Sequence, residues 1–506
     1  MSDFLALPPR GLPWWYPTRP KLVILSLALV LAGAVSWGVW YATHCASGVR
    51  RIGGECVGVT DGGFVFSPDL TLVMEKIRQE NRSVEQAGEP FVSIAYLVAI
   101  PRGADDLPLS EILRHEVQGA YLAQRRANAQ NSQPLIRLLA ANGGEGNEQW
   151  EPVVAQLLGG VGSDRLVAVA GLGRSLETTR QAIGELAEHG IPMIAARLTA
   201  DDLRDIAGQD SVEGLVRVAP TNRDQARAAI AYLKRDPALG RALLIQDVNE
   251  DDLYAKTLGD AFKDEFPDDL HTLIEPVEEY DSSLPGVPNL FGRMMANICQ
   301  QRPDVIYFAG RGSDLVAFVE ALPRRPCPDI LVRIITGDGG GFVAPAIRQR
   351  SEEGEGTRPQ IGLSDNVALS YTALAHPAAW AAAPELFSSN PIAYLQGNFE
   401  EFPDGSLADG GAIVGHDAVA IAVTAIRSAA VQRDLAAAPL TPGDVSQQWN
   451  ALHGLNAVPG ASGWISLDSV GDPVDKAIPI LALQPDGTVA FVALSAAGGT
   501  PFTPPM

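Results

Sequence analysis

The feature that most restricts the fold of this chain is a repeated alternation of short apolar runs and amphipathic segments from Phe91 onward. The apolar runs have the length and composition of buried strands. They are Phe91–Ile100, Leu135–Ala140, Leu166–Ala170, Pro192–Ala196, Ala242–Gln246, Val305–Ala309 and Leu331–Ile335. Segments with helical periodicity lie between them, among them Ser110–Ala129, Leu176–His189, Arg223–Lys234 and Leu253–Phe266. This alternation predicts an α/β fold with parallel sheets and helices on both faces.

The length and the net charge of the chain exclude some classes of function. The chain has 506 residues, enough for two or three compact domains. Its formal net charge of −22 repels phosphate backbones, and no lysine- or arginine-rich tract offsets that charge. We therefore expect no nucleic-acid partner.

The segment Leu22–Ala42 contains no charged residue and is long enough to cross a hydrocarbon core of about 30 Å. Aromatic residues, which prefer the headgroup region, flank or close it: Trp14, Trp15, Tyr16, Trp37, Trp40 and Tyr41. We expect a cytoplasmic tail at 1–21, a single transmembrane anchor at 22–42 and a large extracytoplasmic remainder. Basic residues before and after the span give only a weak charge bias for this orientation.

Two other interpretations of the N-terminus stay open. A cleaved signal peptide usually has a shorter apolar core, and Ala42, Thr43 and His44 are not the small residues preferred before a cleavage site. A lipoprotein would use Cys45, but His44 and Thr43 are unsuitable before a lipidated cysteine. We therefore favour an uncleaved anchor.

The four cysteines form two local pairs, Cys45 with Cys56 and Cys299 with Cys327. An even number outside the membrane allows two disulfides, and the alternative is free buried thiols. There is no C-x-x-C and no metal-ligand spacing of histidines, so we expect no metal site.

Catalytic and cofactor motifs are missing from the sequence. There is no G-x-S-x-G, no G-K pair for a phosphate-binding loop and no H-E-x-x-H. Gly171 and Gly173 lack the third glycine of a dinucleotide-binding loop, so a tight turn before a helix explains them better. His416-Asp417 invites comparison with metal phosphohydrolases, but the sequence has no companion His-Asp cluster to support a metal site. We expect neither a cofactor nor an enzymatic activity.

Loops rich in small and polar residues follow five of the predicted strands. Because ligands bind at the carboxyl ends of parallel strands, these loops are the candidate site. They are Gly171–Ser175, Arg197–Thr199, Asp247–Asn249, Gly310–Gly312 and Thr336–Gly339.

Several segments also carry a family resemblance. They are Val167–Gly173 with Ser175 and Thr178, Gly190–Ile194, Arg217–Thr221 with Gln225 and Ala226, Ala242–Asp247 through Tyr254 and Phe262, and Arg302–Gly310. Their order and spacing resemble those of branched-chain amino-acid-binding proteins, which belong to the type I periplasmic-binding-protein family. The resemblance extends roughly from Phe91 to Val492.

The resemblance implies two α/β lobes joined by a three-strand hinge that close over a small molecule. Lobe 1 would comprise 91–219 and 339–452, and lobe 2 would comprise 220–338 and 453–506. The membrane-proximal segment 43–90 has no recognised counterpart, and a transmembrane anchor is itself a departure from the family's soluble or lipid-tethered form.

The resemblance places ligand contacts in lobe 1 on the hydroxyls of Ser175, Thr178 and Thr199. Helix N-terminal amides would assist Ser175 and Thr178 in binding a carboxylate, and capping of that same helix is the alternative role, which is compatible with ligand contact. Thr199 stands where the family often contacts the ligand's carboxylate. Arg197 departs from the family pattern and points to a more acidic ligand.

In lobe 2 the resemblance implies that Tyr254 covers the ligand, although simple helix packing would also explain it. Arg311 replaces a residue that is usually uncharged. Asp338 stands where related proteins bind the α-ammonium group, and the alternative is that it accepts hydrogen bonds from turn amides.

These observations predict an extracytoplasmic solute-binding protein for a small polar, amino-acid-like ligand, with an ABC permease as partner. A membrane-anchored sensor or interaction protein with the same fold is the alternative, and it would need a membrane signalling partner. An enzyme is the third class, disfavoured by the missing motifs.

The first prediction concerns topology. The intact chain stays in the membrane fraction with its large domain accessible to protease from outside, because Leu22–Ala42 anchors it. Fractionation followed by N-terminal sequencing tests this. A mature protein that begins at Cys45 or Ala46 would refute the anchor.

Overall fold

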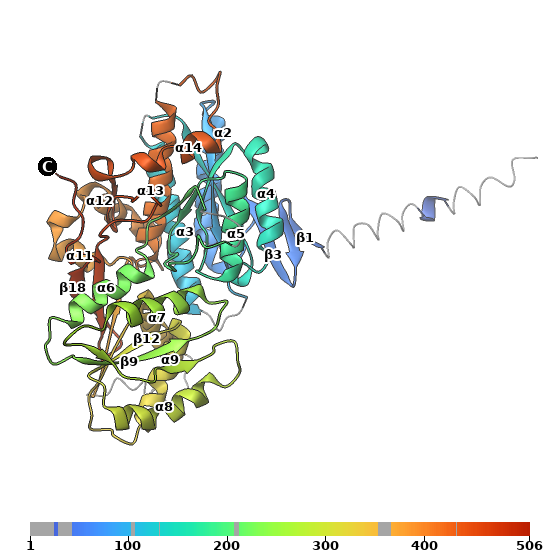
Figure 1. Ribbon diagram of the computed structural model, residues 1–506. Helices are drawn as coiled ribbons and strands as arrows, with labels where there is room; N and C mark the ends of the chain where they lie inside the picture. The colour runs from blue at the N-terminus through green and yellow to red at the C-terminus, as the bar shows by residue number, and fades with distance from the viewer. Residues whose placement is uncertain are drawn as a thin grey trace, which may run out of the picture.

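The computed structural model describes residues 25–28, 43–102, 107–130, 132–206, 212–352, 366–431 and 433–505. The expected tail at 1–21 and all but one helical turn of the expected anchor at 22–42 lie outside these residues. The described chain forms two lobes, each built around a mainly parallel sheet (Figure 1).

The first sheet has the strand order β1-β2-β3-β5-β4-β6-β7-β8. Its strands are β1 (His44–Ala46), β2 (Val49–Ile52), β3 (Glu55–Thr60), β4 (Phe91–Val98), β5 (Leu135–Asn142), β6 (Leu166–Gly171), β7 (Met193–Ala195) and β8 (Leu215–Arg217). Strands β4 to β8 are parallel, whereas β3 joins β5 antiparallel and continues into β2 and β1. Part of the membrane-proximal segment therefore extends the sheet of lobe 1.

Helices cover both faces of this sheet because each presents one apolar stripe to it. They include α2 (Thr71–Gln86), α3 (Leu107–Asn128), α4 (Trp150–Ser163), α5 (Glu177–Glu188) and α13 (Gly411–Ala430). Among the described residues only α13 is long and apolar enough to cross a membrane, but most of it is buried in the core of lobe 1. It is a core helix packed along α3.

The second sheet has the order β10-β9-β12-β13-β14-β17-β18, with β11 also paired to β9. Its strands are β9 (Arg241–Asp247), β10 (Thr272–Leu273), β11 (Glu278–Tyr280), β12 (Val305–Ala309), β13 (Val332–Thr336), β14 (Val367–Thr372), β17 (Ile478–Leu483) and β18 (Val489–Ser495). The associated helices are α6 (Asn222–Leu233), α7 (Leu253–Glu265), α8 (Val287–Gln301), α9 (Gly312–Ala321) and α10 (Val343–Glu352).

The remaining elements are short. The helices are α11 (Pro377–Ala382), α12 (Ser389–Asn398) and α14 (Pro442–Ser446), and the hairpin is β15 (Val458–Gly460) with β16 (Gly463–Ile465). The 3₁₀ turns are η1 (Pro68–Leu70), η3 (Glu145–Asn147), η4 (Leu322–Arg324), η5 (Asp338–Phe342), η6 (Pro384–Leu386), η7 (Phe399–Glu401), η8 (Trp449–Ala451) and η9 (Gly454–Asn456).

The chain passes between the lobes three times: after β8, after β14 and before β17. Two of these crossings lie side by side, because β14 pairs antiparallel with β17 and the Ala373 amide donates to the Pro479 carbonyl at 2.8 Å. The seven predicted strands are present as β4, β5, β6, β7, β9, β12 and β13. The two-lobed α/β fold expected from the sequence is confirmed.

The lobe boundaries differ from the expected division in two places. Strand β14 pairs with β13 in the second sheet, although 339–452 was expected in lobe 1. The reason is that Val367 and Leu369 alternate into the core of lobe 2. Conversely, Val458 and Ile465, in a segment expected in lobe 2, pack in the core of lobe 1.

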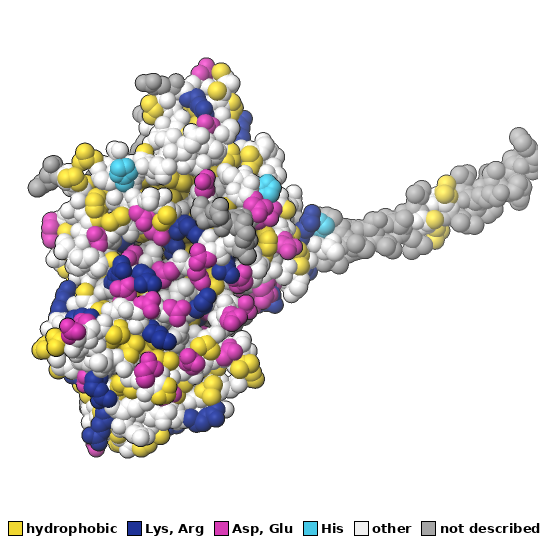
Figure 2. Space-filling model, viewed as in Figure 1, with side chains coloured by type: hydrophobic (Ala, Val, Ile, Leu, Met, Phe, Trp, Pro, Cys, Tyr) yellow, Lys and Arg dark blue, Asp and Glu magenta, His cyan; other side chains and the backbone are white. Residues whose placement is uncertain are grey.

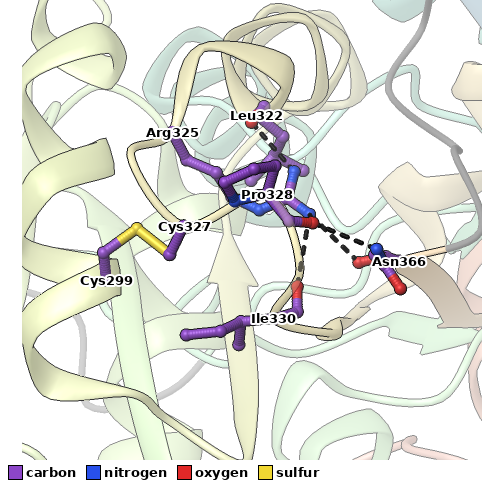
Figure 3. Close-up of a disulfide and its surroundings, with 7 residues drawn as sticks. All are labelled: Cys299, Leu322, Arg325, Cys327, Pro328, Ile330 and Asn366. Carbon is purple, nitrogen blue, oxygen red and sulfur yellow. Dashed lines mark hydrogen bonds between the residues drawn. A yellow bond between two sulfur atoms is a disulfide. The ribbon is translucent and has the colours of Figure 1, made fainter.

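Both cysteine pairs form disulfides, as predicted, with Cα–Cα distances of 5.9 Å for Cys45–Cys56 and 5.7 Å for Cys299–Cys327. Cys299 lies on α8, and Cys327 lies in the loop before β13 (Figure 3). In the same loop the buried Arg325 donates to the carbonyls of Leu322, Pro328, Ile330 and Asn366. The disulfide and this guanidinium together fix the loop.

The second prediction follows from the two loop lengths. Replacing both cysteines of a pair by alanine should destabilise the fold by about 2–4 kcal/mol. The loss should be larger for Cys299–Cys327 because its sequence separation is 28, against 11 for Cys45–Cys56. Chemical denaturation of the two double variants measures this order. Peptide mapping without reduction that found four free thiols would contradict both pairings.

Candidate functional site

A cavity of about 620 Å³ lies between the lobes. One wall is apolar and comes from α3, with Leu109, Ile112 and Leu113. The facing apolar wall comes from lobe 2, with Val316 on α9 and Phe342 in η5. On the face shown in Figure 2, acidic and basic side chains gather along the boundary between the lobes.

Six of the seven predicted site residues line this cavity: Ser175, Arg197, Thr199, Tyr254, Arg311 and Asp338. They converge because the carboxyl ends of both parallel sheets face each other across the lobe boundary. Thr178 does not reach the cavity, since its hydroxyl donates to the carbonyl of Gly146.

The loop after β6 positions Ser175. Gly171, Leu172 and Gly173 have φ angles of 88°, 73° and 81°, a left-handed path that favours glycine at the outer two positions. Asn147 holds the turn by donating from Nδ2 to the Leu172 carbonyl at 3.0 Å. The backbone conformation of this loop, rather than a sequence motif, therefore sets where Ser175 lies.

The Ser175 hydroxyl oxygen accepts hydrogen bonds from the amides of Thr199 at 3.1 Å and Ala200 at 3.3 Å. It does not cap α5, whose N-cap is Leu176 without a side-chain cap bond. Ser175 therefore joins the loops after β6 and β7 and retains a hydroxyl proton to donate toward the cavity.

Arg197 and Thr199, which follow β7, supply the free hydrogen-bonding groups of lobe 1. Within the described residues, the partly buried Arg197 guanidinium forms no hydrogen bond and no ion pair, and the Thr199 hydroxyl forms no hydrogen bond. Both side chains line the cavity. A guanidinium and a hydroxyl together can bind a carboxylate.

Asp338 is the acidic group that lobe 2 presents. Its Oδ1 accepts from Nε2 of the buried Gln225 at 3.0 Å, and its own amide donates back to Gln225 Oε1 at 3.0 Å. Burial raises the pKa of Asp338, and the positive charge of Arg197 opposes that rise. The carboxylate is thus held in place at an electrostatic cost that a cationic ligand group would offset.

Tyr254 on α7 packs in the core of lobe 2, and its hydroxyl accepts a hydrogen bond from the Gly339 amide at 2.9 Å. A Cβ at Gly337 would lie only 2.6 Å from this hydroxyl oxygen, so the approach requires glycine there. Tyr254 therefore combines helix packing with a fixed position at the cavity wall.

Arg311 joins the lobes at one side of the cavity. Its Nε donates to Asp252 Oδ2 at 2.6 Å within lobe 2, and its Nη2 donates to the Ser175 carbonyl of lobe 1 at 2.8 Å. The guanidinium also lies 4.8 Å from the centroid of the Tyr254 ring. Beside it, Leu253 inserts into an apolar cluster of lobe 1. The lobes are therefore in contact on this side.

Sequence reasoning missed Glu116, a buried carboxyl on α3 that also lines the cavity. The Tyr96 hydroxyl donates to Glu116 Oε1 at 2.7 Å. Burial raises the pKa of Glu116, while Arg197 and the Tyr96 hydrogen bond lower it. The available signal was a glutamate on the apolar face of an amphipathic helix, next to Leu113 and Val117.

No protein-family model and no curated protein matches the chain. Solved structures do. A leucine-binding protein from Thermotoga maritima has a TM-score of 0.57 and 17% identity over 80% of this chain and 98% of its own. A branched-chain amino-acid transporter substrate-binding protein from Streptococcus pneumoniae in complex with isoleucine has a TM-score of 0.57 and 17% identity, covering 80% and 99%.

A solute-binding protein of an ABC transporter from R. palustris in complex with benzoate has a TM-score of 0.55 and 15% identity, over 80% of this chain and 96% of its own. At these identities the likeness establishes the fold. The resemblance inferred from the sequence is thereby confirmed: the protein has the fold of branched-chain amino-acid-binding proteins.

The third prediction concerns the link between the lobes. Arg311→Gln should destabilise the fold by about 3 kcal/mol because it leaves the carboxylate of Asp252, with 6% of its side chain exposed, without its cation. Arg348→Gln is the matched control, since its ion pair with Glu111 is solvent-exposed and worth at most about 1 kcal/mol. Denaturant titration compares the two. Equal losses would show that the Arg311 bridge is not a buried ion pair in solution.

Proposed function

We propose that this protein is an extracytoplasmic solute-binding protein that captures a small polar, amino-acid-like ligand between its lobes. The observation that carries the proposal is the interlobe cavity of about 620 Å³, in which unpaired Arg197 and Thr199 of lobe 1 face Asp338 of lobe 2. This volume lies within the range of about 300–1,000 Å³ typical of small-molecule sites.

The composition of the cavity suits a molecule with a charged end and an apolar body. Leu113 and Val316 offer apolar surface, whereas Arg197 and Asp338 offer opposite charges. A zwitterion with an apolar portion would satisfy both. The names of the similar structures, which include complexes with leucine, isoleucine and benzoate, support a ligand of this size.

Binding rather than catalysis is the role that the lining residues support. The described residues around the cavity include neither a histidine nor a cysteine. The oxygen of Ser175 accepts from backbone amides and has no base beside it. A ligand that contacts both lobes would instead stabilise their closed arrangement.

Delivery of the ligand to an ABC permease is the use of binding that the fold favours. A membrane-anchored sensor is the second candidate, and one feature of the chain favours it. Strand β1 begins at His44, directly after the expected span at 22–42, so an anchored chain would hold lobe 1 close to the membrane without a flexible linker. A permease or a signalling protein in the same membrane would then be the partner.

The fourth prediction ranks two site variants. A bound ligand should stabilise the fold by RT ln(1 + [L]/Kd), about 2.7 kcal/mol at a hundredfold excess over Kd. Asp338→Ala should weaken an amino-bearing ligand by roughly 2–5 kcal/mol, because the ligand's charge loses a partner in a closed cleft. Ser175→Ala should cost less, near 1 kcal/mol for one neutral hydrogen bond.

A thermal-shift screen identifies the ligand. Native mass spectrometry of the protein, purified without denaturation, shows whether a ligand co-purifies. Calorimetry then ranks the affinities of the variants. The matched control is Asp329→Ala, an exposed aspartate of lobe 2 away from the cavity. If a ligand binds both site variants as tightly as the parent, Ser175 and Asp338 are structural and the proposed site is wrong.

A further inference from the structure

A second, smaller chamber continues the interlobe cavity toward the hinge. It has a volume of about 100 Å³. Arg197 and Asp338 line both spaces and stand where they meet. Tyr371, which precedes the second crossing between the lobes, and Asp409, which precedes α13, line only the inner chamber. An elongated ligand could therefore occupy both spaces.

The Tyr371 hydroxyl points to an occupant of the inner chamber. Tyr371 as a whole is only 5% exposed, but its hydroxyl oxygen is not among the fully buried atoms that lack a partner, and it forms no hydrogen bond with a described residue. The hydroxyl is therefore accessible from the inner chamber, where it can bond to water or to a ligand. A polar group of a ligand in this chamber would give the hydroxyl its partner.

Asp409 brings a negative charge to the same chamber. Its Oδ2 lies 2.5 Å from Nδ1 of the buried His115, and the Ser406 amide donates to Nε2 of that histidine at 3.1 Å. Nε2 also lies 3.4 Å from the Asp404 carbonyl oxygen, so His115 has polar contacts through both ring nitrogens. The histidine therefore holds the Asp409 carboxyl in a fixed orientation at the chamber.

The unpaired charge of the two spaces is negative. Glu116, Asp338 and Arg197 line the main cavity, and none of the three forms an ion pair with a described residue. Asp409, which contacts His115, adds a third carboxyl at the inner chamber. The other basic residues at the walls already have partners. The ion pairs are Arg102–Glu145, Arg311–Asp252 and Arg348–Glu111, and Arg174 also has a polar or electrostatic interaction. The carboxylates come from both lobes, so positive charge between them would favour closure.

From these contacts we propose that the cleft takes a ligand with one anionic and two cationic groups, which is the chemistry of a dibasic amino acid. The anionic group would bind Arg197 and the hydroxyl of Thr199. One cationic group would lie beside Glu116, and the other would enter the inner chamber between Asp338, Asp409 and the Tyr371 hydroxyl. This inference rests on the proposed function and adds the ligand class to it.

Charge decides between this ligand class and the more acidic ligand that Arg197 alone suggested at the sequence level. An anion would satisfy Arg197 but would share the main cavity with Glu116 and Asp338 and the inner chamber with Asp338 and Asp409. A ligand with one anionic group and two cationic groups satisfies Arg197 and brings two positive charges to those carboxylates. The net charge of −22 on the whole chain attracts such a cation at long range as well.

The test compares ligands that differ in the charge of one terminal group. Calorimetry on the full chain in detergent is carried out with L-lysine, L-ornithine and L-arginine against L-norleucine and L-glutamate. We expect at least one dibasic amino acid to bind about 100-fold more tightly than norleucine, in line with the coupling of close charge pairs. Norleucine or glutamate binding as tightly as the dibasic ligands, or no binding by any of the five, would overturn the inference.

Two variants locate the cationic groups. Glu116→Gln and Tyr371→Phe should each weaken the dibasic ligand about tenfold or more. Norleucine, which has only the α-ammonium group, should lose affinity in just one of the two variants, the one at the site of that group. Tyr371→Phe removes a hydroxyl that bonds to no described residue, so the fold should be retained even if Glu116→Gln unfolds. The matched controls are Glu279→Gln and Tyr232→Phe, which lie away from both spaces.

Failure of this inference is distinguishable from failure of the proposed function. A neutral or acidic molecule that co-purifies in native mass spectrometry and binds in the cleft would overturn the dibasic class and leave solute binding in place. Dibasic ligands whose affinity is unchanged in both Glu116→Gln and Tyr371→Phe would overturn the placement of the two cationic groups.

Discussion

The close backbone contact between α3 and α13 is the interaction on which the site of lobe 1 depends. A Cβ on Gly119 would lie 1.9 Å from the Ala412 carbonyl oxygen, and one on Gly415 would lie 2.1 Å from that of Glu116. Only glycines allow helices to approach so closely. This contact fixes the rotation of α3, so that Glu116 and the apolar residue Leu113 face the cleft.

The hinge connects lobe 1, whose helix α3 forms one wall of the cavity, to lobe 2. Two of the three crossings are joined through β14 and β17, and Tyr371 on β14 lines the inner chamber. Gln225, on the helix that follows the first crossing, holds Asp338 and also accepts from the Thr372 hydroxyl at 2.7 Å. Residues that line the two spaces are thus bonded to the segments that connect the lobes.

The unpaired charges are the main electrostatic feature of the cleft, because burial raises the free energy of a charge that has no partner. Arg311 is already satisfied by Asp252 and the Ser175 carbonyl, and it serves to join the lobes. Arg197 is left free, with Glu116 and Asp338 beside it. The same residue type therefore joins the lobes at one position and is left without an ion-pair partner among the described residues at the other.

The sequence alone determined the α/β class, the seven main strands, both disulfides and six of the residues that line the cavity, because periodicity, cysteine spacing and polar loops after strands are local signals. It did not indicate that Glu116, Tyr371 and Asp409 line the two interlobe spaces, and it assigned the residues of β14 to lobe 1, whereas β14 pairs with β13 in the second sheet. These features depend on how α3 is rotated and on which strands pair across long separations. Only tertiary packing decides which side of a helix faces a cleft and which charges are left without partners.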